Sequence, residues 1–237
     1  MMKKMIICCL TLLFAGAATG KAQDKVETSV SADIVSQYIW RGQDLGGVSV
    51  QPGLSVSYKG LSLSAWGSAG LSNPLDVREF DLTLAYTVGG FNIGITDYWF
   101  DAGEDPLARY FYYRRDATNH VFEANIGYDF GFASLQWYTN FAGNDGFNPE
   151  GKRAFSSYLE AAVPFALGGV DWSAAVGAVP YATDFYGAEK FSVVNLSLTA
   201  SVDIRITDSF SVPVSSQLAF NPCSNAAYLV FGVTLQP

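Results

Sequence analysis

The chain has little cysteine, little histidine and little charge for its length. It has three cysteines and one histidine in 237 residues, and Cys223 is the only cysteine beyond residue 9. An internal disulfide is therefore excluded once an N-terminal leader is removed. Charged residues make up 15%, and 22 acidic residues against 14 basic ones give a net charge of −8. Nucleic acid is excluded as a partner because its binding requires a basic surface.

A second long apolar run is also lacking. The first run, Met5 to Ala18, follows Lys3 and Lys4 and precedes small residues. We therefore expect residues 1–22 to be a cleaved secretory signal peptide. A retained membrane anchor or a lipid attached at Cys8 or Cys9 is disfavoured, because the run is shorter than about 20 residues and both cysteines come early. Helical membrane spans are not predicted in residues 23–237, which we expect to form one domain.

Period-two alternation is what the sequence does have. In residues 80–88, apolar side chains at the even positions alternate with Asp81, Thr83, Ala85 and Thr87 at the odd ones. Such a period is typical of strands and not of helices. The same pattern predicts strands at 28–40, 51–59, 61–69, 79–88, 91–100, 120–130, 132–141, 154–164, 170–179, 191–204, 210–220 and 226–236. We predict an all-β fold, a transmembrane antiparallel up-and-down β-barrel of about twelve strands.

Short and long connections alternate along these predicted strands. Short turns, expected in the periplasm, include 59–60 and 88–90, and the longer outer loops include 101–119 and 142–153. A soluble β-barrel or β-sandwich is the structural alternative, with its apolar face inside. Aromatic residues near strand ends, a small polar opposite face and strands of about ten residues favour the membrane barrel.

The stretch YIWRG at 38–42 places aromatic residues beside a cation at the end of the first predicted strand. Because adjacent strand residues face opposite sides, we expect Tyr38 and Trp40 to lie at the membrane interface and Arg41 to point into the lumen. Trp99 and Trp137 are expected to be interfacial aromatics as well. Asp97 falls on the predicted lipid face, so we expect either a β-bulge or a misread strand there.

The opening DIVSQYIWRGQDLGG, followed by SVQPGLSVSY, resembles that of the TorF-like putative porins. The resemblance rests on Tyr38, Arg41, Gly42, Gln51 and Gly53. It implies an exported outer-membrane β-barrel of largely undefined function with a presumed pore, and it carries no catalytic residues.

The inward faces of the predicted strands are rich in acids. The candidate pore-lining residues are Asp33, Arg41, Asp81, Glu123, Glu160 and Asp203. An acid-rich pore concentrates cations, so these residues predict a channel with a preference for cations. The alternative is that the acids pair with arginines and plug a narrow barrel.

The link 101–119 contains a candidate constriction loop. Arg109, Tyr112, Arg114 and Arg115 could fold inward, face the lumenal acids and narrow the pore. The alternative is an ordinary outer loop.

The sequence does not predict an enzyme, a cofactor or a metal site. His120, the only histidine, fits a solvated loop end better than a catalytic base, and clustered His and Cys ligands are lacking. Asn144, Asp145 and Glu150 would suit calcium, but they are common turn formers too.

We therefore predict a protein of the bacterial outer membrane that lets small solutes or ions pass. Expected partners are outer-membrane lipid and, during biogenesis, periplasmic chaperones and the barrel-assembly machinery. The alternatives are a non-conducting barrel that acts in structure or binding through its outer loops and, third, an enzyme.

Overall fold

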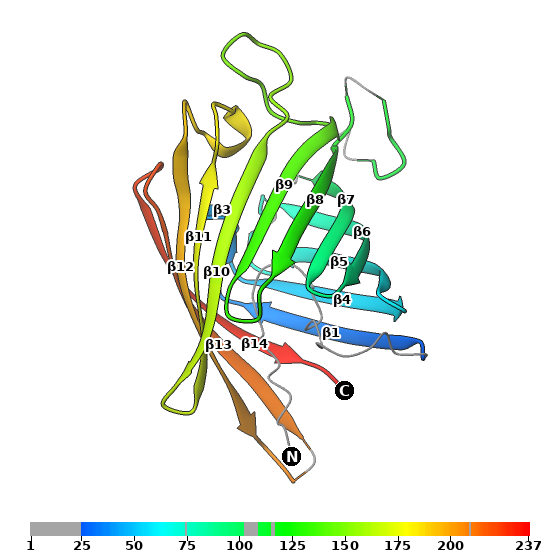
Figure 1. Ribbon diagram of the computed structural model, residues 1–237, viewed down its shortest axis with the longest axis vertical. Coiled ribbons are helices and arrows are strands. Elements are labelled where there is room, and N and C mark those ends of the chain that lie inside the picture. The colour runs from blue at the N-terminus through cyan, green and yellow to red at the C-terminus, as the bar shows by residue number, and fades with distance from the viewer. Residues whose placement is uncertain (1–24, 74, 102–108, 115–116, 209) are drawn as a thin grey trace.

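Twelve antiparallel strands form a closed β-barrel (Figure 1). The computed structural model describes residues 25–73, 75–101, 109–114, 117–208 and 210–237, so the predicted signal peptide, 1–22, lies outside the described residues. The barrel strands are β1 (Glu27–Val35), β4 (Ser49–Tyr58), β5 (Leu61–Gly70), β6 (Arg78–Val88), β7 (Phe91–Asp101), β8 (His120–Asp129), β9 (Ser134–Gly143), β10 (Ser157–Leu167), β11 (Val170–Val179), β12 (Ser192–Arg205), β13 (Ser211–Asn221) and β14 (Ala226–Leu235). The predicted fold class and strand number are confirmed.

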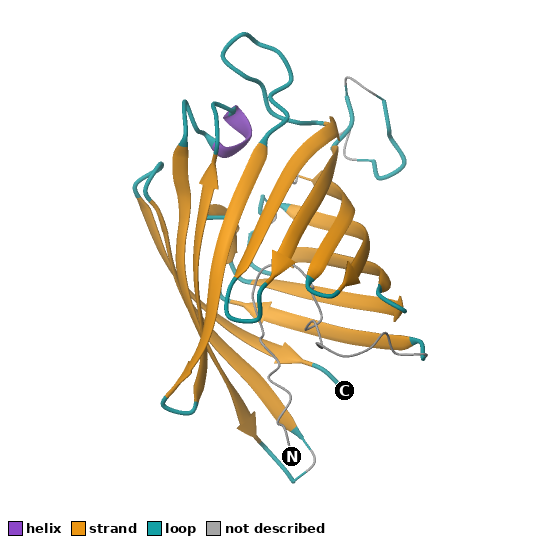
Figure 2. Cartoon of the chain, viewed as in Figure 1, coloured by secondary structure: helices purple, strands orange, loops and turns teal. Residues whose placement is uncertain are grey.

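Each barrel strand pairs with its neighbour in sequence, and β1 closes the barrel by pairing with β14. Longer loops gather at one end of the barrel, while short turns and the C-terminus lie towards the other (Figures 1 and 2). The predicted alternation of short and long connections is therefore confirmed. We call the two ends the loop end and the turn end.

The wall of the barrel is apolar outside and polar inside. On β6, Leu82 and Leu84 are exposed on the outer face, whereas Asp81 is buried on the inner face. The same division holds on the other strands, where exposed Ile95, Leu159 and Phe231 contrast with interior residues that are mostly Asn, Gln, Ser, Thr, Asp and Glu. This is the arrangement that a bilayer requires and the opposite of a soluble barrel.

The first predicted strand, 28–40, is too long. β1 ends at Val35, and the chain then forms a separate two-stranded sheet from β2 (Tyr38–Trp40) and β3 (Gln43–Gly46). Ser36 marks the boundary, since its hydroxyl accepts a hydrogen bond from the Phe231 backbone N–H at 2.9 Å and its own N–H donates to the Phe231 carbonyl. Beyond that last pairing with β14, the chain leaves the wall.

Helix is scarce in the described part of the chain. A single 3-10 turn, η1 (Asp184–Tyr186), lies in the loop between β11 and β12. Among the described residues, no helix has the length and apolar character needed to cross a membrane.

Candidate functional site

A hairpin made by residues 36–48 lies inside the lumen, and we call it the plug hairpin. It turns at Arg41 and Gly42, between Trp40 and Gln43, which are paired. Both turn residues have positive φ, 49° and 77°. Two consecutive positive φ angles are what a two-residue type I′ hairpin requires. Arginine takes this conformation only with strain, so Arg41 must be held in it by its contacts.

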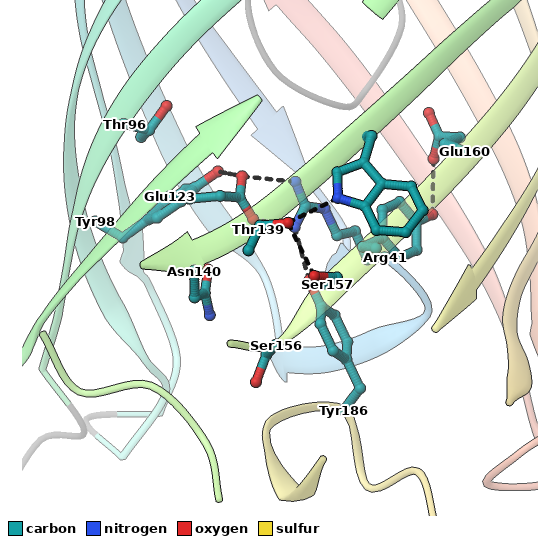
Figure 3. A network of polar contacts seen from close by, with 12 residues as sticks. Arg41, Thr96, Tyr98, Glu123, Thr139, Asn140, Ser156, Ser157, Glu160 and Tyr186 are labelled. Atoms are coloured by element: carbon teal, nitrogen blue, oxygen red, sulfur yellow. Dashed lines mark hydrogen bonds and ion pairs between the residues drawn. The ribbon is translucent and has the colours of Figure 1, made fainter. Parts of the chain in front are cut away.

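The side chain of Arg41 forms an ion pair with Glu123 on β8 that uses both carboxylate oxygens (Figure 3). The two nitrogen-to-oxygen distances are 2.6 and 2.9 Å. Both side chains are only 2% exposed. The Tyr98 hydroxyl donates a further hydrogen bond to Glu123 at 2.9 Å. A desolvated pair of this geometry holds the tip of the plug hairpin against the inner wall.

Aromatic rings surround the guanidinium group of Arg41. Its central carbon lies 4.1 Å from the ring centroid of Tyr138, 4.5 Å from that of Trp40 and 4.7 Å from that of Tyr158. Stacking of a cation on aromatic faces strengthens when water is excluded. The rings therefore stabilise a charge that would otherwise be costly inside the barrel.

Other contacts fix the plug hairpin along its length. The Tyr38 hydroxyl donates to Glu79 on β6 at 2.7 Å, and the Asn221 amide of β13 donates to the Gly42 carbonyl at 3.0 Å. Gly42 also lies against the wall, since a Cβ there would be 1.9 Å from the Val194 carbonyl oxygen. The plug hairpin thus touches the inner wall on several sides of the barrel.

The loop between β11 and β12 covers the plug hairpin from the loop end. Tyr186 of η1 accepts a hydrogen bond from Arg41 at 2.7 Å and stacks on Trp40. Burial raises the pKa of the Tyr186 phenol well above its ordinary value. The phenol therefore stays neutral, and it supplies a dipole to Arg41 without adding a second negative charge.

The predicted pore-lining residues occupy different depths of the lumen. Asp81 and Glu123 are buried deep on the inner wall, and Arg41 is buried in the plug hairpin. Asp33 and Glu160 are half-buried and accept hydrogen bonds from Thr234 and Tyr158. Asp203 is exposed near the turn end of β12. Arg41 and Glu123 are the two of these six that the structure joins directly.

The predicted membrane-interface position is wrong for Tyr38 and Trp40. Both are 6% exposed and lie in the lumen, because the wall ends at Val35 and the alternation no longer assigns faces in the plug hairpin. Trp99 and Trp137 do lie on the outer face, but their position at a membrane interface stays a prediction.

The sequence did not predict four residues of the site, which are Tyr98, Tyr138, Tyr158 and Tyr186. Tyr98, Tyr138 and Tyr158 occupy inward-facing positions of their strands. Large aromatic rings are unusual in a water-filled lumen, and this pattern could have indicated that something packs against them.

The predicted constriction loop does not line the pore in the part that is described. Residues 109–114 pack against the outer wall through Tyr110, which contacts Phe80 and Trp99. Arg109 and Arg114 are exposed and Tyr112 is half-buried, while Arg115 lies outside the described residues. The apolar outer surface offers these rings more contact than a polar lumen, which accounts for the direction of folding.

The expectation of a β-bulge or a misread strand at Asp97 is wrong, because Asp97 faces outward in unbroken register with both neighbouring strands. It pairs with His120, whose Nδ1 lies 2.7 Å from an Asp97 carboxylate oxygen. The other ring nitrogen, Nε2, lies 2.5 Å from the Tyr110 carbonyl oxygen, and the ring stacks on Tyr113. The expectation that His120 is a solvated loop-end residue is wrong, since it is fully buried under residues 109–114. Burial raises the pKa of the Tyr110 phenol to about 12.

Within the described ranges, no group of three or more His, Cys, Asp and Glu side chains is arranged to hold a metal ion. Of the calcium candidates, Asp145 is used internally, since its carboxylate accepts hydrogen bonds from Asn140 and the Ser156 backbone. Its role is to anchor the loop between β9 and β10.

Comparison with known proteins identifies a family. The model of Gcw_chp, described as a bacterial protein of unknown function, matches residues 18–212. A search of curated proteins gave no match.

Similar solved structures are porins at low sequence identity. Salmonella typhi OmpF in complex with daunomycin is 10% identical, with a TM-score of 0.36 over 90% of this chain and 98% of that one. A mutant of Rh. blastica porin is also 10% identical, with a TM-score of 0.38 over 90% of this chain and 100% of that one. Pseudomonas aeruginosa OccK9 (OpdG) is 14% identical, with a TM-score of 0.31 over 88% of this chain and 57% of that one. The closed barrel follows from the strand pairing of this chain.

Proposed function

The chain belongs to the bacterial family Gcw_chp, whose function is unknown, and we propose that it is a porin-like channel of the outer membrane gated by its plug hairpin. Small solutes or ions pass the lumen when the hairpin leaves the inner wall. The resemblance to TorF-like putative porins supports this proposal, as does the polar inner wall inside an apolar outer belt.

The observation that carries the proposal is the way in which the plug hairpin is attached. It interrupts the connection between β1 and β4, whose last and first residues, Val35 and Ser49, are themselves partners in the wall. The barrel wall is therefore continuous without residues 36–48. A gate of this kind can move without opening the barrel.

Lumenal charge favours cations in the proposed channel. Glu79, Asp81 and Glu123 are buried on the inner wall, and Arg41 of the plug hairpin is bound to one of them. When the hairpin leaves, Glu123 is exposed to the lumen together with the other two acids. Rings of acidic side chains select cations in pores.

The alternative is a non-conducting barrel that acts in structure or in binding through its outer loops. The burial of Arg41 and the cluster of aromatic rings around it favour this alternative, because both stabilise a closed lumen. The two functions differ in what happens once the plug hairpin is removed.

The test replaces residues 36–48 by Asn-Gly, the two-residue turn that suits two directly paired strand residues. Heat-modified gel mobility checks that the shortened barrel folds, and planar bilayers measure its conductance. We expect the shortened barrel to conduct more than the full chain and to prefer potassium over chloride. A shortened barrel that is folded and electrically silent would overturn the channel and leave the non-conducting alternative.

A further inference from the structure

A pocket of about 500 Å³ lies on the outer side of the wall at the loop end. Its described lining includes Phe122 on β8, Phe141 on β9 and the loop residues Arg153 and Phe155. The pocket is separate from the lumen, so a ligand bound in it is independent of conduction through the barrel.

Aromatic rings make one side of the pocket. The rings of Phe122 and Phe141 are 6.3 Å apart, and Tyr113 lies 6.4 Å from Phe122. The β8–β9 register shifts between Phe122 and Glu123, which leaves Phe141 without an opposite residue. Bulges of this kind re-aim side chains. Here Phe141 and Phe155 remain 43% and 50% exposed, and together they offer an apolar surface to a chain-like ligand.

Arg153 is the one cation among the described residues that line the pocket, and it makes the other side. Arg153 donates one hydrogen bond from Nη2 to the Gly143 carbonyl at 2.9 Å. This atom's neighbour on the guanidinium group, Nη1, is buried from solvent and has no hydrogen-bond partner among the described residues. A buried N–H of a charged group without a partner is costly, and each such group calls for an explanation. None of the described residues that line the pocket is acidic.

We propose that this pocket binds one phosphate-bearing lipid of the surrounding leaflet. The phosphate accepts hydrogen bonds from the guanidinium group of Arg153, whose Nη1 turns from its buried position to meet the phosphate, and an acyl chain lies along Phe141, Phe155 and Phe122. Guanidinium groups suit phosphate because two parallel N–H groups can bind two oxygens. The pocket is at the edge of the apolar outer belt, where a lipid would present a head group and a chain together.

The experiment is native mass spectrometry of the full chain released from dodecyl maltoside micelles. The probes are palmitoyl-oleoyl phosphatidylglycerol, a diacylglycerol with the same chains, and inorganic phosphate as a competitor. We expect one phosphatidylglycerol to be retained per barrel, the diacylglycerol to be lost, and inorganic phosphate to leave the bound lipid in place.

Two variants locate the site. Arg153→Gln should weaken retention by at least about tenfold, because a hydrogen bond to a charged group is lost. Phe141→Ala should weaken it less, by loss of apolar contact. The matched control is Arg205→Gln, which removes a cation that is exposed and paired with Asp208. Folding of each variant is checked by heat-modified gel mobility.

Three results would overturn the proposal. They are equal retention by Arg153→Gln and the parent chain, equal retention of the diacylglycerol, and displacement of the lipid by inorganic phosphate alone. If Arg153→Gln does not fold, Phe141→Ala decides the question, because its side chain is on the outer surface and unchanged retention would exclude the pocket.

Discussion

Arg41 and Glu123 are 82 residues apart in sequence, yet their side chains form a bidentate ion pair inside the barrel. One residue belongs to the tip of the plug hairpin and the other to the wall. The pair therefore links the position of the plug hairpin to whether the lumen is filled. Removing this contact is the most direct test.

Arg41→Gln should destabilise the folded barrel by about 3–5 kcal/mol, because Glu123 is left as a buried charge without its partner. Glu123→Gln should have a similar effect. The double variant should be much less destabilised than the sum of the two. Urea unfolding of the three variants in detergent micelles measures these free energies. Strictly additive effects would show that the pair does not couple the hairpin to the wall.

Gly42→Ala should displace the plug hairpin without any change of charge. A Cβ at this position would meet the Val194 carbonyl oxygen at 1.9 Å. The exposed tip should then be cut by trypsin after Arg41 faster than in the parent chain. Gly89→Ala is the matched control, since Gly89 also has positive φ but no atom lies within 4 Å of the position that its Cβ would take. Equal cleavage of both variants would contradict the close approach at Gly42.

Glu79→Gln combined with Asp81→Asn should reduce the preference for potassium over chloride in the barrel that lacks residues 36–48. Both carboxylates are on the inner wall and face the lumen once the hairpin is removed, where acidic side chains attract cations. The reversal potential in a salt gradient measures the change. Asp208→Asn, at an exposed turn outside the lumen, is the control. An equal shift in both variants would mean that the lumenal acids do not set the selectivity.

His120→Phe should loosen residues 109–114 from the outer wall. The substitution keeps a ring but leaves the partly buried Asp97 carboxylate unpaired, which costs at most about 1–3 kcal/mol. Trypsin cleavage after Arg109 and Arg114 reports the release. Adding Asp97→Leu should restore resistance, because it removes the carboxylate that lost its partner. Persistent rapid cleavage in the double variant would assign the stability to the Tyr110 backbone contact instead.

Alkaline pH should release residues 109–114 from the outer wall only at a pH above the ordinary pKa of tyrosine. The Tyr110 pKa is raised to about 12 by burial and by a hydrogen bond with Tyr113. A raised pKa means that the contact stabilises the fold fully below pH about 10 and loses that contribution as pH rises through about 12. The difference in ultraviolet absorbance between the parent chain and Tyr110→Phe gives the midpoint. A midpoint near 10 would show that Tyr110 is not held in this contact.

Period-two alternation was enough to predict the wall. It identified every barrel strand, because a strand between lipid and water must place apolar and polar side chains on opposite faces. It failed at Tyr38 and Trp40, where the same alternation continues after the chain has left the wall. Ser36 is a polar residue on the otherwise apolar face, and it indicates where the strand ends. Within Arg41-Gly42, only the glycine is typical of a turn.

The side-chain contacts of the site could not be predicted from the sequence for a different reason. Glu123 and Arg41 were both expected in the lumen, but their pairing depends on the depth at which the hairpin enters, which no local pattern encodes. The same holds for His120 and Asp97. Asp97 alone looked misplaced and His120 alone looked like a solvated loop-end residue, and each is explained by a partner on the neighbouring strand that the register brings close.

The plug hairpin directly follows β1, the strand that closes the barrel against β14. Its Ile39 packs against Val230 of β14 and Ala219 of β13, beside the closing seam. The hairpin therefore lies beside the seam at which the two ends of the sheet meet. In the proposed channel, closing the barrel also fills its lumen, so the completed barrel starts in the plugged state.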